Sequence, residues 1–297
     1  MIRPLFWLSL YLICIPKFAL AAEFEREQIV FGNVNLRVQI KGDLTKKEAF
    51  KLMEKAFKIA KVYDATFSSY REDSELVKIN QMVAKQKPQK LSRRMAKALK
   101  IAESMRIKTN GSFDAGYETP NVERPIYRIN KQHELIYLET EGRINPTGLI
   151  KGLYVDEVTE KLLANHQVKS VMVAASGDIR VASKDNSGRV VLLENPNRPS
   201  HRQHVLLKNE AISTSGEYHR GHHLVNTGKG KGRALQVSVR ANDCLTSDTL
   251  DTALFYLDIE AIHSVLKNFP AVEVYMLEKK DGYKLIHGKH HAVLPSQ

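Results

Sequence analysis

The sequence predicts an α+β fold with mixed, mostly antiparallel sheets and long flanking helices. Several long segments repeat apolar residues at helical spacing, and several short segments are rich in β-branched residues. Their order along the chain is typical of helices combined with antiparallel strands. No internal repeat and no Gly-, Ser- or Pro-rich linker divides residues 22–297, so we expect them to form one domain.

The first residues of the chain predict a cleavable secretory signal peptide over residues 1–21. A short positive start, Met1-Ile2-Arg3, precedes an apolar run from Leu5 to Ile15. Pro16 interrupts this run, and Ala19-Leu20-Ala21 supplies the small residues that signal peptidase recognises. The run is roughly half as long as a membrane-spanning helix. An uncleaved membrane anchor is the alternative interpretation.

Cleavage leads us to expect an exported protein, located in the periplasm and soluble. A lipid anchor at Cys14 is less well supported, because Ile13 is larger than the residue that usually precedes a lipidated cysteine. After cleavage only Cys244 remains, so no internal disulfide is expected. The formal net charge of +12 favours anionic partners. Export argues against nucleic acid as that partner.

Hydrophobic periodicity in the first part of the chain predicts a hairpin followed by three helices. Residues 27–41 alternate loosely and turn near Gly32-Asn33. The segments with helical spacing are Thr45–Val62, Ser74–Asn80 and Ser92–Lys108. Ser74 and Ser92 are the expected N-caps. A polar loop over Asp64–Tyr70 is expected to end the first helix.

The rest of the chain predicts short strands and three more helices. Residues 117–143 are polar and irregular, and a buried strand over Val168–Val181 is broken at Ser176-Gly177-Asp178. The other expected strands are near Tyr127, Ile136–Leu138, Val190–Leu193, Val205–Leu207 and Ala234–Val239, with a closing hairpin over Val272–Leu277 and Tyr283–Ile286. The expected helices are Gly148–Asn165 after a short loop, Ser247–Leu257 and Glu260–Asn268.

Four segments combine Gly, Ser or Thr with Asp or Lys beside an apolar element. They are Phe67–Tyr70 with Ser74–Asn80, Thr109–Asp114, Ile144–Gly152 and Thr246–Phe255. In the first, Tyr70 either offers a flat ring to an aromatic ligand or packs on its own domain. In the second, Asp114 either contacts a polar ligand or belongs to an ordinary helix end at Gly111.

The other two segments favour phosphate and metal chemistry. The loop before the helix of Gly148–Asn165 exposes backbone N–H groups, and Lys151 adds a cation, which suits a phosphate or a plain helix start. Asp248 and Thr252 are four residues apart, so they share a helix face. Their oxygen atoms suit Mg²⁺, although helix capping by Ser247 and Asp248 is an alternative.

A histidine-rich stretch follows a segment of small hydroxyl residues at Ala211–Tyr218. His219, His222 and His223 are candidates for metal ligands or for a base. No cysteine lies nearby and the stretch offers no helical His-x-x-x-His, so a zinc site is the weaker interpretation.

Taken together, these segments resemble the ApbE-type FAD:protein FMN transferase family, from about residue 28 to the C-terminus. Each match is weak alone, but their order and spacing are specific. The matching segments are Phe67-Ser-Ser-Tyr70, Ser74-Glu-Leu76 with Asn80, Gly111–Asp114, Gly148–Gly152, Val155-Asp156, Ser176–Asp178, Ser213–Gly216 and Ser247–Phe255. The resemblance implies an exported enzyme that binds FAD and Mg²⁺, releases AMP, and attaches FMN to a Thr or Ser of an extracytoplasmic flavoprotein.

The resemblance also implies roles for particular residues. Mg²⁺ would be held by the main-chain carbonyl of Gly148 and by Asp248 and Thr252. His223 and Asp248 would be the catalytic residues. Contacts to FAD would come from Phe31, Tyr70, Ser112, Phe113, Asp114, Asn145, Lys151 and Val225. The implied protein partner is an acceptor flavoprotein or flavin-carrying domain, including one attached to a membrane.

The chain departs from the family pattern around the flavin and phosphate sites. The family's Asp-Leu-Gly-Gly loop is Asn145-Pro-Thr-Gly148 here, and its Asp-Pro-x-Thr-Gly is replaced by Asn226-Thr-Gly-Lys-Gly. Its early Met-Gly-Thr is Phe31-Gly-Asn33, and its paired glycines are Ser176-Gly177. Two alternatives to transfer therefore stay open: a flavin-binding or scaffold protein without chemistry, and a pyrophosphatase that cuts FAD with water.

Overall fold

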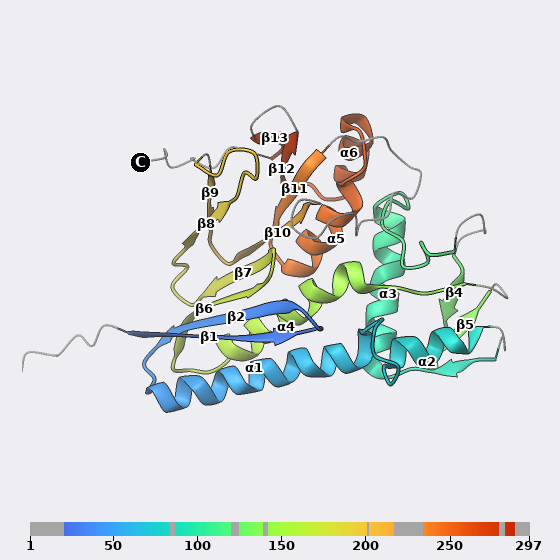
Figure 1. Ribbon diagram of the computed structural model, residues 1–297, viewed down its shortest axis with the longest axis horizontal. Helices are drawn as coiled ribbons and strands as arrows, with labels where there is room; N and C mark the ends of the chain where they lie inside the picture. The colour runs from blue at the N-terminus through green and yellow to red at the C-terminus, as the bar shows by residue number, and fades with distance from the viewer. Residues whose placement is uncertain are drawn as a thin grey trace, which may run out of the picture.

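The protein is described by a computed structural model over residues 21–83, 87–119, 125–138, 142–200, 202–216, 234–278 and 283–288. Its centre is an eight-stranded sheet with long helices packed beside it (Figure 1). The strands follow one another across the sheet in the order β1-β2-β6-β7-β10-β11-β12-β13. Helices combined with antiparallel strands confirm the α+β class that the sequence predicts.

Each neighbouring pair of described strands is antiparallel. The strands of the central sheet are β1 (Ala22–Val30), β2 (Val34–Gly42), β6 (Val168–Ala175), β7 (Asp178–Ser183), β10 (Glu210–Gly216), β11 (Ala234–Ala241), β12 (Glu273–Glu278) and β13 (Tyr283–His287). A small sheet joins β3 (Gln89–Lys90), β5 (Glu134–Tyr137) and β4 (Tyr127–Ile129), and a separate hairpin joins β8 (Arg189–Leu193) to β9 (Gln203–Leu207).

The helices lie close to where hydrophobic periodicity places them. They are α1 (Lys46–Phe67), α2 (Glu75–Gln81), α3 (Arg93–Lys108), α4 (Ile150–Leu163), α5 (Cys244–Leu254) and α6 (Ile259–Leu266), with a short 3₁₀ turn η2 (Thr147–Leu149) before α4. Ser74 and Ser92 cap α2 and α3 as expected, each accepting a backbone hydrogen bond at 3.1 Å. At the start of α1, Thr45 and Glu48 form a capping box.

Three boundaries differ from the sequence prediction. Helix α1 continues to Phe67, beyond Val62, because Tyr63 and Phe67 extend its buried face. Residues 168–183 form a tight hairpin, β6–β7, in place of one broken strand. Helix α5 begins at Cys244 with Asp243 as its N-cap, three residues before the expected start, so Ser247 and Asp248 lie inside the helix and do not cap it.

The expected first hairpin is present as β1–β2. Its turn contains Phe31 and Gly32, both with positive φ, of 48° and 74°. Alternate side chains of β2 are buried against the helices, which explains the loose alternation of the sequence. The turn carries Phe31 and Asn33 toward the same cavity as the loops after α1 and α3.

Two apolar clusters hold the layers together. The larger lies between the helices and the central sheet, where α4 packs on β6 and β7 while α5 packs on β10 and β11. The smaller joins the β8–β9 hairpin to side chains of β7, β10 and β12. Among the described residues, no helix has the length and apolar character needed to cross a membrane.

Candidate active site

A cavity of about 810 Å³ opens where loops and strand ends from the whole length of the chain meet. This volume is typical of pockets for sizeable small molecules. Its lining includes every described residue to which the sequence assigns a role: Phe31, Tyr70, Ser112, Phe113, Asp114, Asn145, Gly148, Lys151, Asp248 and Thr252. His223 and Val225, together with His219 and His222, lie outside the described residues.

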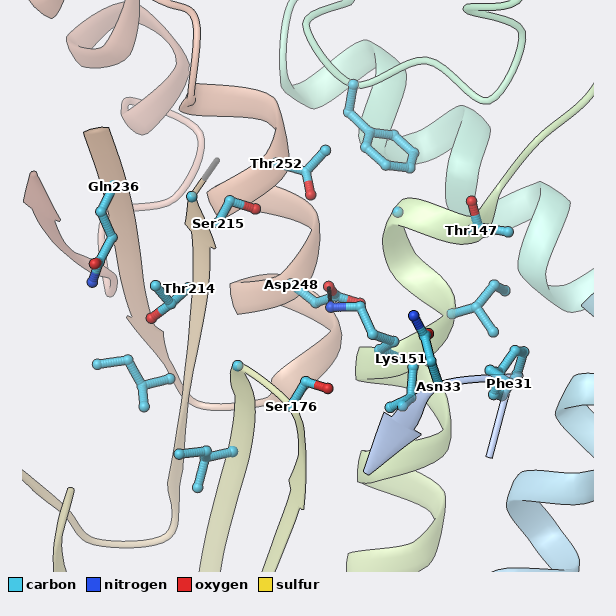
Figure 2. A pocket seen from close by; sticks show the side chains of 18 of the residues that line it. Phe31, Asn33, Thr147, Lys151, Ser176, Thr214, Ser215, Gln236, Asp248 and Thr252 are labelled. Atoms are coloured by element: carbon cyan, nitrogen blue, oxygen red, sulfur yellow. Dashed lines mark ion pairs between the residues drawn. The ribbon is translucent and has the colours of Figure 1, made fainter. Parts of the chain in front are cut away.

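Three buried aspartates gather at one wall of the cavity. Asp178 is the first residue of β7, and Asp248 and Asp251 lie one turn apart on α5. One carboxylate oxygen from each lies within 4.8 Å of the others. Lys151 forms ion pairs with Asp178 and with Asp248, the latter at 3.1 Å between Nζ and Oδ1. Figure 2 shows Lys151 reaching from α4 toward Asp248, with Thr252 further along α5.

The two helices that carry these groups are held together by specific contacts. The Asp248 carboxylate accepts a hydrogen bond from the Gly152 backbone N–H at 2.7 Å. The Asp156 carboxylate accepts from the N–H groups of Cys244 and Leu245 at the start of α5, each at 2.9 Å. A Cβ on Gly152 would come within 2.5 Å of the Cys244 carbonyl oxygen, so the close approach of α4 and α5 requires glycine there.

Burial changes the acid strength of the cluster. Desolvation and the neighbouring Asp178 raise the pKa of Asp248 from 3.8 to about 7, against the opposing effect of Lys151. Burial, Asp178 and Asp248 also raise the pKa of Asp251 well above its usual value. Burial alone would lower the pKa of Lys151, but the three aspartates raise it far above its ordinary value. The lysine therefore stays an ammonium at neutral pH, and the raised pKa values of Asp248 and Asp251 favour their protonated forms.

The donor set at this wall fits a hard divalent cation. Asp178 is fully buried, and its Oδ1 atom has no hydrogen-bond partner. An orphaned carboxylate oxygen is costly unless a cation or water satisfies it. The Thr252 hydroxyl and the backbone of Gly148 lie beside one another, since a Cβ on Gly148 would stand 3.9 Å from Thr252 Oγ1. Carboxylate, hydroxyl and carbonyl oxygens are the ligands that Mg²⁺ prefers.

Aromatic rings form another part of the lining. Phe31 stacks on Tyr154 with ring centroids 5.4 Å apart. Phe113 is buried, whereas the Tyr70 side chain is 92% exposed and lies in the loop between α1 and α2. Tyr70 therefore does not pack on its own domain, which was the alternative to ligand contact. An exposed ring beside a cavity can stack on a planar ligand.

The turn after α3 is built by its own hydrogen bonds. The Ser112 hydroxyl donates to the Thr109 carbonyl at 2.7 Å, and Asp114 Oδ1 accepts from the Gly116 N–H at 2.8 Å. Gly111 has a φ of 77°, which suits the helix end expected there. The same turn places Ser112, Phe113 and Asp114 on the cavity wall, so the helix-end and ligand-contact interpretations are compatible.

Asn145, in the loop before η2, is engaged in a local network. Its amide donates to the Tyr117 hydroxyl at 3.0 Å and to Glu118 at 2.7 Å. Its carbonyl oxygen accepts from the Thr147 hydroxyl at 2.6 Å. An aspartate could not donate to Glu118, so in this chain the amide fits its surroundings better than a carboxylate would.

The structure adds cavity residues that received no individual role from the sequence. Thr214, Ser215 and Gln236 line it from β10 and β11 (Figure 2). Behind the lining, Asp178 and Asp251 complete the acidic cluster with Asp248. The sequence could have indicated Asp251 as a further site residue, because it lies three residues after Asp248 and residues at this spacing share a helix face. Cys244 is fully buried beside Ser213, and burial raises the pKa of its thiol well above the usual value, which fits a core role.

Comparisons with known proteins identify similar chains. A family model described as the ApbE family matches residues 33–276. A curated FAD:protein FMN transferase of Haemophilus influenzae is 26% identical over 269 residues, covering 75% of this chain and 77% of that protein. A second, from Buchnera aphidicola, is 24% identical over 233 residues, covering 64% of this chain and 68% of that protein.

Solved structures share the fold at low sequence identity. The flavin transferase ApbE of Vibrio cholerae has a TM-score of 0.75 at 21% identity, covering 89% of this chain and 96% of its own. The apo form of the Pseudomonas stutzeri flavinyl transferase ApbE has a TM-score of 0.75 at 19% identity, covering 89% and 94%. The ApbE protein of Thermotoga maritima has a TM-score of 0.76 at 19% identity, covering 89% and 97%.

Proposed function

Because the chain belongs to the ApbE family, we propose that it is a Mg²⁺-dependent transferase that moves FMN from FAD to a protein hydroxyl. The acceptor is a Thr or Ser of an extracytoplasmic flavoprotein, and AMP is released. The curated relatives named FAD:protein FMN transferase support this activity. The observation that carries the proposal is one cavity that joins an aromatic wall to a buried Lys151–aspartate cluster.

The proposed reaction is a phosphoryl-type transfer that balances without a redox step. The acceptor hydroxyl oxygen forms a bond to the FMN-side phosphorus of FAD, and the bridging bond from that phosphorus to the AMP oxygen breaks. AMP leaves with the bridging oxygen, and the hydroxyl proton goes to a base. Catalysis of such a step consists mainly of positioning and charge stabilisation.

Different residues of the cavity have different proposed roles in this reaction. Lys151 lies where its ammonium can attract a phosphate oxygen, in place of one of its two carboxylate partners. Asp248 is proposed to act in catalysis as a ligand of Mg²⁺, since its buried carboxylate lies beside Lys151. His223 is the candidate base, on the family resemblance alone. Tyr70 and Phe31 provide rings for the flavin end of FAD.

Mg²⁺ fits the acidic wall of the cavity. Asp248, Thr252 and the Gly148 carbonyl are the proposed ligands, with Asp178 and Asp251 as further carboxylates beside them. When bound, the ion supplies positive charge that neutralises the pyrophosphate as the bond breaks. Three carboxylates and one ammonium sum to a charge of about −2 when all are ionised, which matches one divalent cation.

The reaction is proposed to take place outside the cytoplasm. The pattern over residues 1–21 supports export to the periplasm, where FAD and the acceptor must then both be present. The acceptor is proposed to be a soluble or membrane-attached flavoprotein that presents its hydroxyl residue on an accessible segment, because the reacting phosphorus lies inside a cavity.

Intact mass spectrometry of an acceptor domain tests the proposal. Purified protein with FAD, Mg²⁺ and the acceptor is expected to give an acceptor heavier by one FMN, together with AMP. Asp248→Ala is expected to abolish transfer, whereas Asp185→Ala, in an exposed turn away from the cavity, retains it. Undiminished transfer by Asp248→Ala would remove its assignment as a metal ligand and catalytic residue.

The same assay separates the two alternatives. Free FMN and AMP formed without any acceptor would identify a pyrophosphatase that uses water. FAD binding without AMP under any condition would identify a binding or scaffold protein. Either result would contradict the transferase proposal, because it predicts AMP in proportion to modified acceptor.

A further inference from the structure

Helix α1 carries a row of lysines on its outer face. Lys47, Lys51, Lys55, Lys58 and Lys61 are all exposed and follow one another at intervals of three or four residues. Residues at these intervals share one side of a helix. The opposite side buries Met53, Phe57, Ala60 and other core residues, so the lysines point away from the protein. Figure 1 shows α1 running along one edge of the molecule.

These positive charges are not neutralised within the described part of the chain. None of the five lysines forms an ion pair there. The three acidic residues of α1 are each engaged elsewhere: Glu48 in the capping box, Glu54 with Arg26, and Asp64 with Arg71. The row is therefore a positive strip about 21 Å long, interrupted on the same face by Glu54, whose carboxylate pairs with Arg26.

We propose that this lysine face of α1 docks on a bilayer that contains anionic phospholipids. A bilayer offers a flat plane of negative charge, and a straight helix at the edge of the protein can lie along it. Lysine suits this attraction because its ammonium is a compact charge on a flexible stem and needs no fixed partner geometry. Val62, which is 45% exposed, extends the same face with an apolar side chain.

Vesicle sedimentation tests the proposal. The protein is expressed from its full-length reading frame, purified after cellular processing and checked by intact mass spectrometry. Vesicles of phosphatidylcholine with 30% phosphatidylglycerol, a composition of about one anionic lipid in three, are compared with phosphatidylcholine alone. The protein is expected to bind only the anionic vesicles, and binding is expected to be lost in about 1 M salt. Each lysine near the headgroups contributes roughly a fivefold increase in partitioning.

Matched variants assign the binding to α1. Replacing Lys47, Lys51, Lys55 and Lys58 by Gln is expected to lower partitioning at least a hundredfold, on the order of four fivefold steps. The control replaces four exposed lysines around α3 by Gln, namely Lys90, Lys97, Lys100 and Lys108, and has the same net charge. The control is expected to keep most of the binding, and both variants to keep the unfolding temperature of the parent protein.

Several outcomes would overturn the inference. These are the absence of binding to anionic vesicles, equal binding to neutral vesicles, or equal losses in the two variants. Binding to poly-glutamate beads without binding to vesicles would instead identify an acidic protein as the partner of this face. Release of AMP from FAD, measured with the acceptor domain and without lipid, is expected to be unchanged in the α1 variant, so failure here is distinguishable from failure of the proposed activity.

Discussion

At the scale of single residues, the main feature is a lysine enclosed by three buried aspartates. Such a group is costly to bury, because each charge loses its hydration. The cluster nevertheless satisfies its charges in part, through Lys151 and through the Gly152 N–H. The orphaned oxygen of Asp178 marks the remaining deficit. This unpaired oxygen supports the proposal that the cluster binds Mg²⁺.

The raised pKa of Asp248 predicts how stability depends on pH without metal. The carboxyl ionises near 3.8 in the unfolded chain and near 7 in the folded protein, so the unfolded state loses its proton first as pH rises. The free energy of unfolding is therefore expected to fall between pH 4 and pH 8, by about 4 kcal/mol from this group. Asp248→Asn keeps an acceptor for the Gly152 N–H and removes this loss.

Urea unfolding in EDTA at these two pH values measures the effect. The parent protein is expected to lose more stability than Asp248→Asn between the lower and the higher pH. An equal loss in the two proteins would contradict a buried, proton-sharing Asp248. Asp185→Asn, at an exposed position, is the matched control and should follow the parent protein.

At the scale of elements, the contact between α4 and α5 determines the geometry of the site. Lys151 lies on one helix and Asp248 on the other, and Gly152 is the point of closest approach. The Asp156 carboxylate fixes the start of α5 against α4 and is itself paired with Arg180. The spacing of these helices therefore matters as much as the identity of the charged residues.

Gly152→Ala is expected to disturb both stability and the cavity. The added methyl group would meet backbone atoms of α5 at 2.5 Å, and backbone cannot move aside as a flexible side chain can. We expect a loss of about 1–3 kcal/mol in the free energy of unfolding and weaker FAD binding, as helix spacing increases. Thermal unfolding and flavin fluorescence titration measure the two effects.

A control on the same helix separates strain from helix propensity. Lys161→Ala lies on the exposed side of α4 and is expected to change stability by less than about 0.5 kcal/mol. If Gly152→Ala were at least as stable as the parent protein, with unchanged FAD binding, the contact at Gly152 would not set the spacing of α4 and α5. Without strain at that contact, Ala would even raise stability, because it is a better helix former than Gly.

The elements also show what the sequence can predict. Features that depend on a few neighbouring residues can be predicted from the sequence. They include the caps at Ser74 and Ser92, the turn at Gly32, and the helix face shared by Asp248 and Thr252. The predicted start of α5 at Ser247 was wrong, because the helix begins at Cys244 with Asp243 as its N-cap. Asp243 comes just after β11, so its capping role can be recognised only when the end of that strand is known.

The acidic cluster illustrates the limit of sequence reasoning. Asp178 opens β7 and stands 70 positions before Asp248, so no spacing rule connects the two residues. Their meeting depends on the order of strands in the sheet, with β10 between β7 and β11, and on α5 packing over β10 and β11. The family resemblance supplied Asp248 and Thr252, but the Lys151–aspartate grouping needed the fold.

At the scale of the whole molecule, the cavity draws its walls from segments that extend from Phe31 to Thr252. A ligand that binds such a cavity contacts many elements at once, and it stabilises only the folded state. Adding FAD and Mg²⁺ at about a hundred times the dissociation constant is expected to raise the free energy of unfolding by about 2.7 kcal/mol. For a chain of this size the unfolding temperature should rise by roughly 5 °C or more.

Differential scanning fluorimetry measures this shift, with FAD and Mg²⁺ added separately and together. The largest shift is expected with both, since the ion neutralises the phosphates beside the carboxylates. Asp248→Ala should lose the part that depends on Mg²⁺ and keep the part from FAD alone. A shift that is identical with and without Mg²⁺ in the parent protein would contradict a shared site.

The origin of the cavity walls also has a consequence for biosynthesis. A ribosome releases the chain from its N-terminus, and Lys151 emerges 97 residues before Asp248. At ordinary elongation rates this interval lasts roughly 5 to 20 seconds. Throughout it the lysine has no α5 beside it, and the nascent chain has no complete set of carboxylates. The acidic wall of the cavity can therefore form only after the last third of the chain has been synthesised, and a partly synthesised chain lacks the proposed catalytic site.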